Sequence, residues 1–520
     1  MEERTMKKLI AFALIGMLFL SACGDSNSNP DNANKNSSSE LQESSAGRES
    51  DAEQAQTDQT AALPIVKVEN RHLLRYTEDG EVLLSELEQD NITLDGIGYE
   101  KAAETVKRLF YVSDEVMERA VDDYAEMAQE QYEFEKDQGW FANYVSVTTY
   151  EIARLDTKVL SVKSWGYDYS GGAHGNSWAG GATIDLESGL ELELSRLADD
   201  APGFMDKTLE FVIAELGKRQ DELYEDYESY VKENWENTDW YLDAVGIEFT
   251  FSPYAIGPYS SGSIIVCVPY EEVAEYMKPE YLDVSGEYIR MFPAECEAAD
   301  REGTYRVSIE YRQTGEYMEE TYLHVNGKEQ KLGEHVYVTQ AYLMCRANGR
   351  SFLVYTVDWA SDDYETYVCE LTAEGAVQTD SIWARIDGKN MNPKEMNLVF
   401  SLDILGTYSS QMRYELSEEG VFTALDNVYS IQPHQGGGTG LVTIKALPVK
   451  MDGQETTLPS GSEISVTATD NAGTAWFEGI DASGKSVAGE IHYERREDEW
   501  QLYIDGVSEY EYFEMLPYVG

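Results

Sequence analysis

The stretch Tyr144–Asn176, YVSVTTYEIARLDTKVLSVKSWGYDYSGGAHGN, decides the fold of the first half of this 520-residue chain. It contains two runs rich in β-branched and aromatic residues, Tyr144–Ala153 and Val159–Tyr169, with a turn at Asp156 between them. Such runs on either side of a short polar turn predict two antiparallel strands. A glycine-rich loop, 171–181, and a strand, Ala182–Leu186, are expected to follow. The stretch therefore predicts the middle of an antiparallel sheet.

On both sides of this stretch the pattern mixes helix and strand. Residues 64–68 and 81–84 flank an Asp79-Gly80 turn and predict a β-hairpin. Residues 99–136 show helical spacing with a restart at Ser113-Asp114, and 202–235 predict a further helical region. Strands Gly246–Phe251 and Gly262–Val268 come next. We therefore expect an α+β domain over 63–288, an antiparallel sheet with two long helices.

From about residue 300 onward the helical pattern is absent. Short β-rich runs alternate with turns, and Asn326-Gly327 and Asn348-Gly349 are hairpin dipeptides. We expect a β-rich domain over 300–435 and a small β domain over 440–520, whose size fits an SH3-like barrel. In the small domain, Asp470–Gly473 and Asp481–Gly484 are interpreted as hairpin turns rather than calcium loops. The fold class is thus an α+β half followed by a mainly β half.

The N-terminus has the organisation of an export signal. Lys7 and Lys8 precede a short apolar run, and Leu20-Ser21-Ala22-Cys23 resembles a bacterial lipobox, in which the cysteine is acylated and becomes the mature N-terminus. We expect residues 1–22 to be a lipoprotein signal peptide, 23–62 a disordered tether, and the protein to lie on the outer face of the cell membrane, held by lipid on Cys23. The alternative is an ordinary signal peptide with a chance cysteine.

The charge of the chain restricts its partners. There are 97 acidic and 39 basic residues, a formal charge of −58. The negative field of such a chain repels nucleic acid and anionic lipid surfaces. It favours binding of cations or basic proteins, or it contributes to solubility alone. Beyond Cys23 the cysteines are far apart and have no metal-ligand spacing, so we expect buried thiols: Cys267, Cys296, Cys345 and Cys369.

The most unusual segment is the loop that follows Trp165. Its glycines allow positive φ and close backbone approach, and its aromatic residues and hydrogen-bond donors are typical of a ligand-contact loop. A second segment, Phe249–Gly262, pairs with it. The candidate ligand-binding residues are Tyr167, Tyr169, Gly171, Gly172, His174, Asn176, Tyr254 and Tyr259. The alternative is a long turn joining two strands, with His174 hydrogen-bonded locally.

Three elements occur in the same order in a known family. They are Gly171-Gly-Ala-His-Gly175, the segment Asp185-Leu-Glu-Ser-Gly189-Leu-Glu-Leu192-Glu-Leu194, and Phe249-Thr-Phe-Ser-Pro-Tyr-Ala-Ile-Gly-Pro-Tyr-Ser-Ser-Gly262. Over about 64–285 the chain thereby resembles the extracellular domain of lysozyme-responsive anti-sigma factors and the companion domain beside some peptidoglycan deacetylases. The resemblance implies an α+β binding module for a basic protein such as lysozyme. We find no sigma-binding segment or membrane-spanning helix in the sequence, so signalling by proteolysis is not expected.

Catalytic motifs are not found in the sequence. The six histidines show no HExxH spacing, there is no GxSxG, P-loop or GxGxxG, and the paired acidic residues are adjacent in sequence. We expect no catalytic residue, no metal and no cofactor. Three hypotheses stay open: a binding module for a protein or cell-wall glycan, an envelope scaffold whose β-rich half carries the function, and an unrecognised hydrolase.

Overall fold

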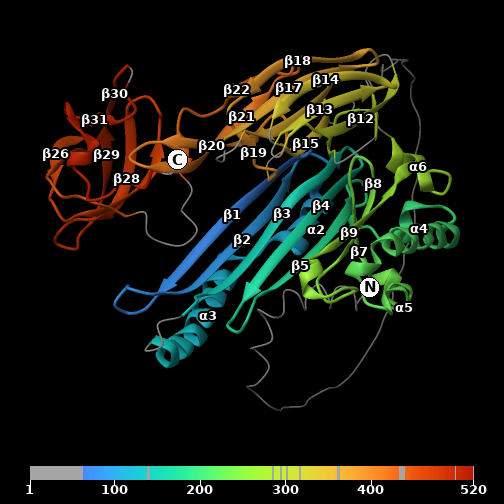
Figure 1. The fold of residues 1–520 in the computed structure, drawn as a ribbon, viewed down its shortest axis with the longest axis horizontal. Coiled ribbons are helices and arrows are strands. Elements are labelled where there is room, and N and C mark those ends of the chain that lie inside the picture. Colours follow the sequence, from blue (N-terminus) through green and yellow to red (C-terminus); the bar gives the residue numbers. More distant parts are fainter. Residues whose placement is uncertain are drawn as a thin grey trace, which may run out of the picture. The chain divides into compact units, whose positions relative to one another are not determined.

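The structure is a computed structural model (Figure 1) that describes residues 63–518, apart from 137–140, 284–285, 293–295, 300–302, 316–317, 336, 360–362, 390, 432–439 and 498. The predicted signal peptide, Cys23, the tether and His434 lie outside the described residues. Among the described residues, no helix is both long enough and apolar enough to cross a bilayer.

The predicted hairpin of Tyr144–Tyr169 is present and forms the middle of the first sheet. Strands β3 (Tyr144–Asp156) and β4 (Val159–Tyr169) pair antiparallel, and β4 pairs with β5 (Asn176–Asp185), which adjoins β6 (Leu190–Glu191). The turn at Asp156 is held by its Oδ1, which accepts the amides of Lys158 and Val159, each at 2.8 Å. In Figure 1 these strands are the long ribbons that run alongside one another.

The glycine-rich loop is shorter than predicted. Strand β5 begins at Asn176, so the loop covers 170–175, and the predicted loop end at 181 is wrong. Residue 181 lies within β5. It is a glycine because the ring of Tyr241, on another strand, packs where a side chain at position 181 would lie. A Cβ there would lie 2.5 Å from that ring. This long-range contact places a glycine in a strand that local pattern assigns to a loop.

The N-terminal hairpin and two helices complete this side of the sheet. Strand β1 (Ile65–Tyr76) pairs antiparallel with β2 (Leu83–Asp95), and β2 runs parallel to β3. A parallel neighbour needs a long crossover connection, which α2 (Glu100–Phe110) and α3 (Asp114–Glu135) supply. The predicted restart at Ser113 is confirmed, and α2 buries Ala102, Val106 and Phe110 against the sheet.

Alternate residues of β4 separate two cores. Leu160 and Val162 pack in the cluster that contains α2, whereas Val159 packs with the second sheet and its helices. This is the period-two alternation of a strand buried on both faces. The second layer consists of β7 (Asp239–Leu242), β8 (Gly246–Phe251), β9 (Ile264–Pro269), α4 (Ala201–Leu216), α5 (Tyr227–Asn234), α6 (Tyr270–Val273), α7 (Pro279–Leu282) and the short helices η3 (Leu194–Leu197), η4 (Gly217–Glu222), η5 (Trp235–Asn237) and η6 (Tyr259–Ser261).

Strand pairing crosses the predicted boundary between 288 and 300. Strand β10 (Tyr288–Met291) joins β3 to β15 (Tyr337–Cys345), and the same sheet continues through β16 (Ser351–Asp358), β17 (Tyr364–Thr372) and β18 (Gly375–Ile382). A separate antiparallel sheet contains β11 (Cys296–Ala299), β12 (Thr304–Gln313), β13 (Glu319–Val325) and β14 (Lys328–His335). Every residue of β16 is buried, because the sheet of β11–β14 packs on one face of the strand. A third large sheet packs on its other face.

The third large sheet crosses the predicted boundary near 435. It contains β19 (Arg385–Ile386), β20 (Met396–Asp403), β21 (Thr407–Leu416), β22 (Phe422–Ala424), β23 (Tyr429–Ile431), β24 (Leu441–Val442), β25 (Leu447–Met451), β26 (Gln454–Leu458), β27 (Glu463–Thr469), β28 (Thr474–Ile480) and β29 (Ser486–His492). A small sheet of β30 (Glu494–Arg495), β31 (Leu502–Ile504) and β32 (Val507–Ser508), with η7 (Glu509–Glu511), follows. The mainly β second half is confirmed, and the SH3-like barrel stays a prediction.

Candidate functional site

The glycines in the loop between β4 and β5 have two different structural roles. Gly171 and Gly172 have φ of 91° and 95°, the left-handed region that favours glycine. Gly175 does not need that conformation; instead a Cβ on it would lie 2.4 Å from Cζ of the Tyr167 ring. The two glycines at the start therefore bend the chain, and Gly175 lets the returning chain lie directly on a tyrosine.

The second predicted segment is fixed to the same end of the sheet. After β8, the Oγ of Ser252 accepts the amide of Ala179 on β5 at 3.2 Å and donates to its carbonyl at 3.3 Å. Tyr254 follows with a φ of 68°, unusual for a tyrosine, and its amide donates to the carbonyl of Gly257 at 3.0 Å. This tight turn holds the Tyr254 side chain 52% exposed.

The loop and the second segment meet at His174. Its ring stacks on that of Tyr259, with centroids 4.2 Å apart and planes inclined by 21°, and Tyr254 lies 5.7 Å from Tyr259. His174 is exposed and Tyr259 is half-buried. The two segments thus meet in the structure, with His174 and Tyr254 exposed and Tyr259 half-buried between them. We call His174, Tyr254 and Tyr259 the ring face.

Hydrogen bonds fix the tautomer of His174. Nδ1 lies 2.8 Å from the carbonyl oxygen of Gly175, which can only accept, so Nδ1 carries a proton. In a neutral imidazole Nε2 then accepts, and the hydroxyl of Tyr254 lies 3.4 Å from it. The histidine is therefore oriented by the loop itself and presents its ring plane as part of an aromatic surface.

The other predicted ligand residues lie around the ring face. Tyr167 is half-buried beneath Gly175, and Tyr169 lies at the base of the loop, where its hydroxyl donates to Gly172 at 3.2 Å and its ring meets Tyr144 edge to face. Asn176 is exposed at the start of β5, opposite Asp168 on β4. Tyr167 thus lies beneath the residue next to His174, and Tyr169 and Asn176 lie outside the ring face.

One residue near this surface was missed from the sequence. Trp165 is 40% exposed, and its ring is stacked with that of Tyr167, with centroids 6.4 Å apart and planes inclined by 6°. It stands two residues before Tyr167 on β4, and residues at this spacing lie on one face of a strand. That spacing is the sequence pattern that could have identified it.

Two buried carboxyl groups with raised pKa lie elsewhere, in the hairpin of β7 and β8. Asp243 and Glu248 are both buried, and burial raises the pKa of each; for Asp243 the neighbouring Glu248 adds to the effect. Asp243 accepts the amides of Val245 and Gly246, at 2.8 and 2.9 Å, and so closes the turn between the strands. Burial also raises the pKa of the nearby Cys267 thiol, which opposes a thiolate nucleophile. The geometry shows this group closing the turn between β7 and β8.

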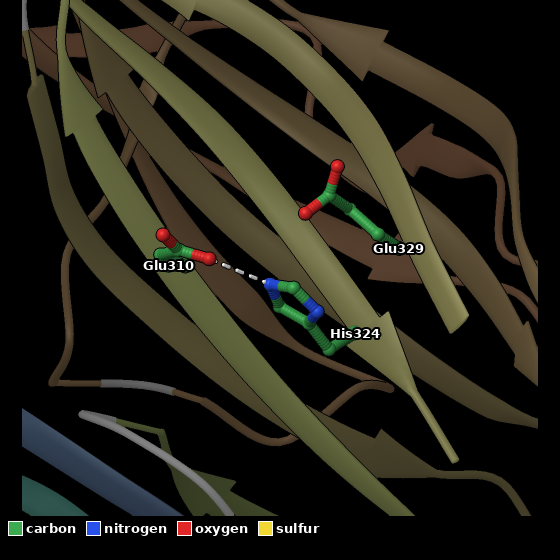
Figure 2. Close-up of side chains that lie close together, drawn as sticks. All are labelled: Glu310, His324 and Glu329. Atoms are coloured by element: carbon green, nitrogen blue, oxygen red, sulfur yellow. Dashed lines mark hydrogen bonds and ion pairs between the residues drawn. The ribbon is translucent and has the colours of Figure 1, made fainter. Parts of the chain in front are cut away.

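A second group has donors that suit a metal ion. Glu310, His324 and Glu329, on β12, β13 and β14, offer ligand atoms within 4.8 Å of one another, and Figure 2 shows the three side chains converging. Arg312 already donates to both oxygens of Glu310, at 2.7 and 2.8 Å, and to Glu329. The hydrogen bonds from Arg312 and His324 lower the pKa of Glu310 to about 2. A guanidinium therefore supplies the positive charge that a metal would bring.

Two family matches in the α+β first half of the chain suggest an extracytoplasmic accessory domain of unknown function. Residues 90–177 match the family described as Deacetylase PdaC, and residues 201–271 match the family described as Protein of unknown function (DUF3298). The predicted resemblance to a deacetylase companion domain is confirmed. Neither match supplies positive evidence of catalysis by this chain.

Two solved structures of DUF3298 family members are similar to part of this chain. A DUF3298 family member from Bacteroides fragilis is 16% identical, with a TM-score of 0.33, over 42% of this chain and 95% of that one. A DUF3298 family protein from Pseudomonas aeruginosa is 14% identical, with a TM-score of 0.26, over 42% of this chain and 97% of that one. A comparison with curated proteins gives no significant match.

Proposed function

We propose that this protein is an exported lipoprotein, held by lipid on Cys23 at the outer face of a bacterial membrane, that binds a basic protein through the ring face. Lysozyme is the partner that the sequence resemblance implies. The observation that carries the proposal is the contact of His174 with Tyr254 and Tyr259, since two motif segments about 80 residues apart meet there with exposed rings.

The chemistry of the ring face suits such a partner. Exposed tyrosine and histidine rings bury large area at low entropic cost, and their faces attract lysine and arginine cations. The chain carries a formal charge of −58, so a basic partner would be steered toward it. The same rings could stack on a cell-wall sugar, and a glycan is therefore the second ligand to test.

The test is binding of hen-type lysozyme to the full chain, measured by calorimetry at about 50 mM salt, where screening is weak. Changing His174 and Tyr254 together to alanine is expected to weaken binding at least ten-fold, about 1.4 kcal/mol. The matched control is Tyr230→Ala, because Tyr230 is an exposed tyrosine on α5 outside the ring face.

The outcomes separate the proposals. Equal affinity of the double variant and the wild type would remove the ring face as the site, and binding of neither lysozyme nor soluble peptidoglycan fragments would remove the binding function. The second hypothesis, an envelope scaffold acting through its β-rich half, would then take its place. Lipidation is tested separately: mass spectrometry of the membrane fraction should find an acylated Cys23, and Cys23→Ala should release the protein from the membrane.

A further inference from the structure

The outer face of β27–β29 carries a tryptophan that takes no part in the core. On β28, Ala475 and Phe477 are buried in the large hydrophobic cluster, so Trp476 and Glu478 lie on the opposite face by alternation. Trp476 is half-buried and Glu478 is exposed. Trp476 therefore lies outside the core, and packing in the core does not explain why a tryptophan occurs at this position.

Strand pairing places Trp476 in a row of side chains. It lies opposite Glu490 on β29 and opposite Ala468 on β27, and Glu490 in turn lies opposite Lys450 on β25. The Nζ of Lys450 is 3.1 Å from Oε2 of Glu490. The ring is thus flanked on one side by an ion pair.

The tip of the β25–β26 hairpin completes a hollow beside this row. Asp452 and Gly453 have φ of 51° and 75°, the two positive values of a tight hairpin turn. The hollow measures about 280 Å³ and is lined by Lys450, Asp452, Thr467, Trp476, Glu478 and Glu490. Gly489 lets β25 lie close to β29, since a Cβ there would lie 2.6 Å from the carbonyl oxygen of Lys450.

The charges of the lining are not balanced. It holds three carboxylates and one ammonium group, and Glu490 is satisfied by Lys450. In the described part of the chain, neither Asp452 nor Glu478 has a hydrogen bond or an ion pair through its side chain. Two unpaired carboxylates beside a tryptophan ring form a site that attracts a cation with an apolar body, since tryptophan is the strongest cation–π partner among the aromatic residues. An anionic ligand would be repelled.

We propose that this hollow binds the free ammonium group of an aliphatic amine, such as the side chain of a lysine or diamino acid residue in a peptide. The ammonium group lies between Asp452 and Glu478, and the aliphatic stem lies against Trp476. The volume is at the lower limit for a small-molecule pocket, so it suits one side chain rather than a whole ligand. The site is separate from the ring face and does not depend on the function proposed for it.

The test uses the full chain and a tripeptide, Ala-Lys-Ala, blocked at both termini so that the side-chain ammonium is its one amine. Binding is followed by tryptophan fluorescence at low salt, and Trp476→Phe identifies the contribution of Trp476 among the nine tryptophans. We expect a saturable change in the wild type that is at least five-fold weaker in Asp452→Asn and in Glu478→Gln. Asparagine tolerates positive φ, so the turn should persist, which thermal melting checks. Glu494→Gln, at an exposed carboxylate on β30, is the matched control.

The comparison peptide is Ala-Nle-Ala, with norleucine in place of lysine, which keeps the stem and lacks the ammonium group. Equal binding of the two peptides, or unchanged affinity in both folded carboxylate variants, would overturn the proposal. A fluorescence response to N-acetylglucosamine with none to the lysine peptide would overturn it as well and assign the hollow to a sugar.

Discussion

The imidazole of His174 lies 4.2 Å from the ring of Tyr259, nearly parallel to it, and joins a loop of the first sheet to the segment after β8. Such a pair contributes about 0.5–1.5 kcal/mol beyond the area it buries. A double-mutant cycle with His174→Ala and Tyr259→Ala should give a coupling free energy of that size in urea denaturation. A cycle that combines His174→Ala with the distant Tyr230→Ala should be additive within about 0.5 kcal/mol. Additivity in both cycles would show that the stack contributes nothing.

The two kinds of glycine in the loop predict different effects of alanine. Gly172→Ala meets open space, so its cost is the positive φ alone, about 1–2 kcal/mol. Gly175→Ala places a methyl group 2.4 Å from the ring of Tyr167, which must move, at about 1–3 kcal/mol. Near-ultraviolet circular dichroism should change in Gly175→Ala and stay that of the wild type in Gly172→Ala. Identical spectra and stability for Gly175→Ala and the wild type would contradict the contact.

The buried arginine at the junction of β3 and β10 predicts a large loss of stability. Arg154 is fully buried, donates to Asp156 at 2.8 Å, and also donates to the hydroxyl of Tyr270 at 2.9 Å. Arg154→Met leaves Asp156 with the Arg290 guanidinium at 3.2 Å and the two backbone amides of the turn, and should cost about 3–5 kcal/mol of unfolding free energy. Arg219→Met breaks an exposed pair with Glu222 and should cost less than about 1 kcal/mol. Denaturation of both variants provides the comparison, and equal losses would be inconsistent with the burial argument.

The sequence pattern predicted most strands, because the alternation of apolar and polar residues and the turn residues are features of neighbouring positions. Strand β8 has the predicted bounds, and the hairpin at Asn326-Gly327 is present between β13 and β14. Strand β14, Lys328–His335, was not predicted, because its sequence is mostly charged and its pairing with β13 supplies the order. The start of β5 at Asn176 was not predicted either, since it depends on the pairing of Asn176 with Asp168 of β4.

The candidate site could be predicted only in part, because its motifs are local sequence patterns and its contacts join distant segments. The family resemblance pointed to the loop and to the Tyr254–Tyr259 segment, whereas the stacking of His174 on Tyr259 joins residues far apart in the sequence, which no periodicity encodes. The sheets that cross residues 288–300 and 435–440 also depend on distant pairing: Tyr288 of β10 lies between Asp156 and Cys345. A change in local composition therefore did not mark a break in the sheet.

A half-buried histidine in the first hairpin predicts a pH dependence of stability. His72 on β1 lies 2.8 Å from Glu86 on β2, and the hydrogen bond raises the pKa of His72 above 6.5 and lowers that of Glu86 below 4.5. The contribution of His72 is fully present below pH 6.5 and is lost as the pH rises through its raised pKa. That of Glu86 is present above pH 4.5 and is lost as the pH falls through its lowered pKa. The wild type should therefore lose stability relative to His72→Gln as the pH rises from 6.5 through the raised pKa of His72, as measured by urea denaturation. A constant difference between the two proteins over this range would contradict the pairing.

Arg312 predicts how a zinc site could be opened on the sheet of β12–β14. Its guanidinium contacts Glu310 and Glu329 and lies 3.9 Å from the centre of the Tyr322 ring. It therefore fills the place where the two carboxylates would bind another cation. Arg312→Gln removes that charge and leaves Glu310, Glu329 and His324 within 4.8 Å of one another, a donor set that zinc accepts. The variant should bind zinc at least ten-fold more tightly than the wild type in calorimetry, and its melting temperature should rise with zinc concentration. Adding His324→Ala to Arg312→Gln removes the nitrogen ligand and should abolish the gain. If Arg312→Gln and the wild type bind zinc equally, the guanidinium is not what keeps a metal from these three residues.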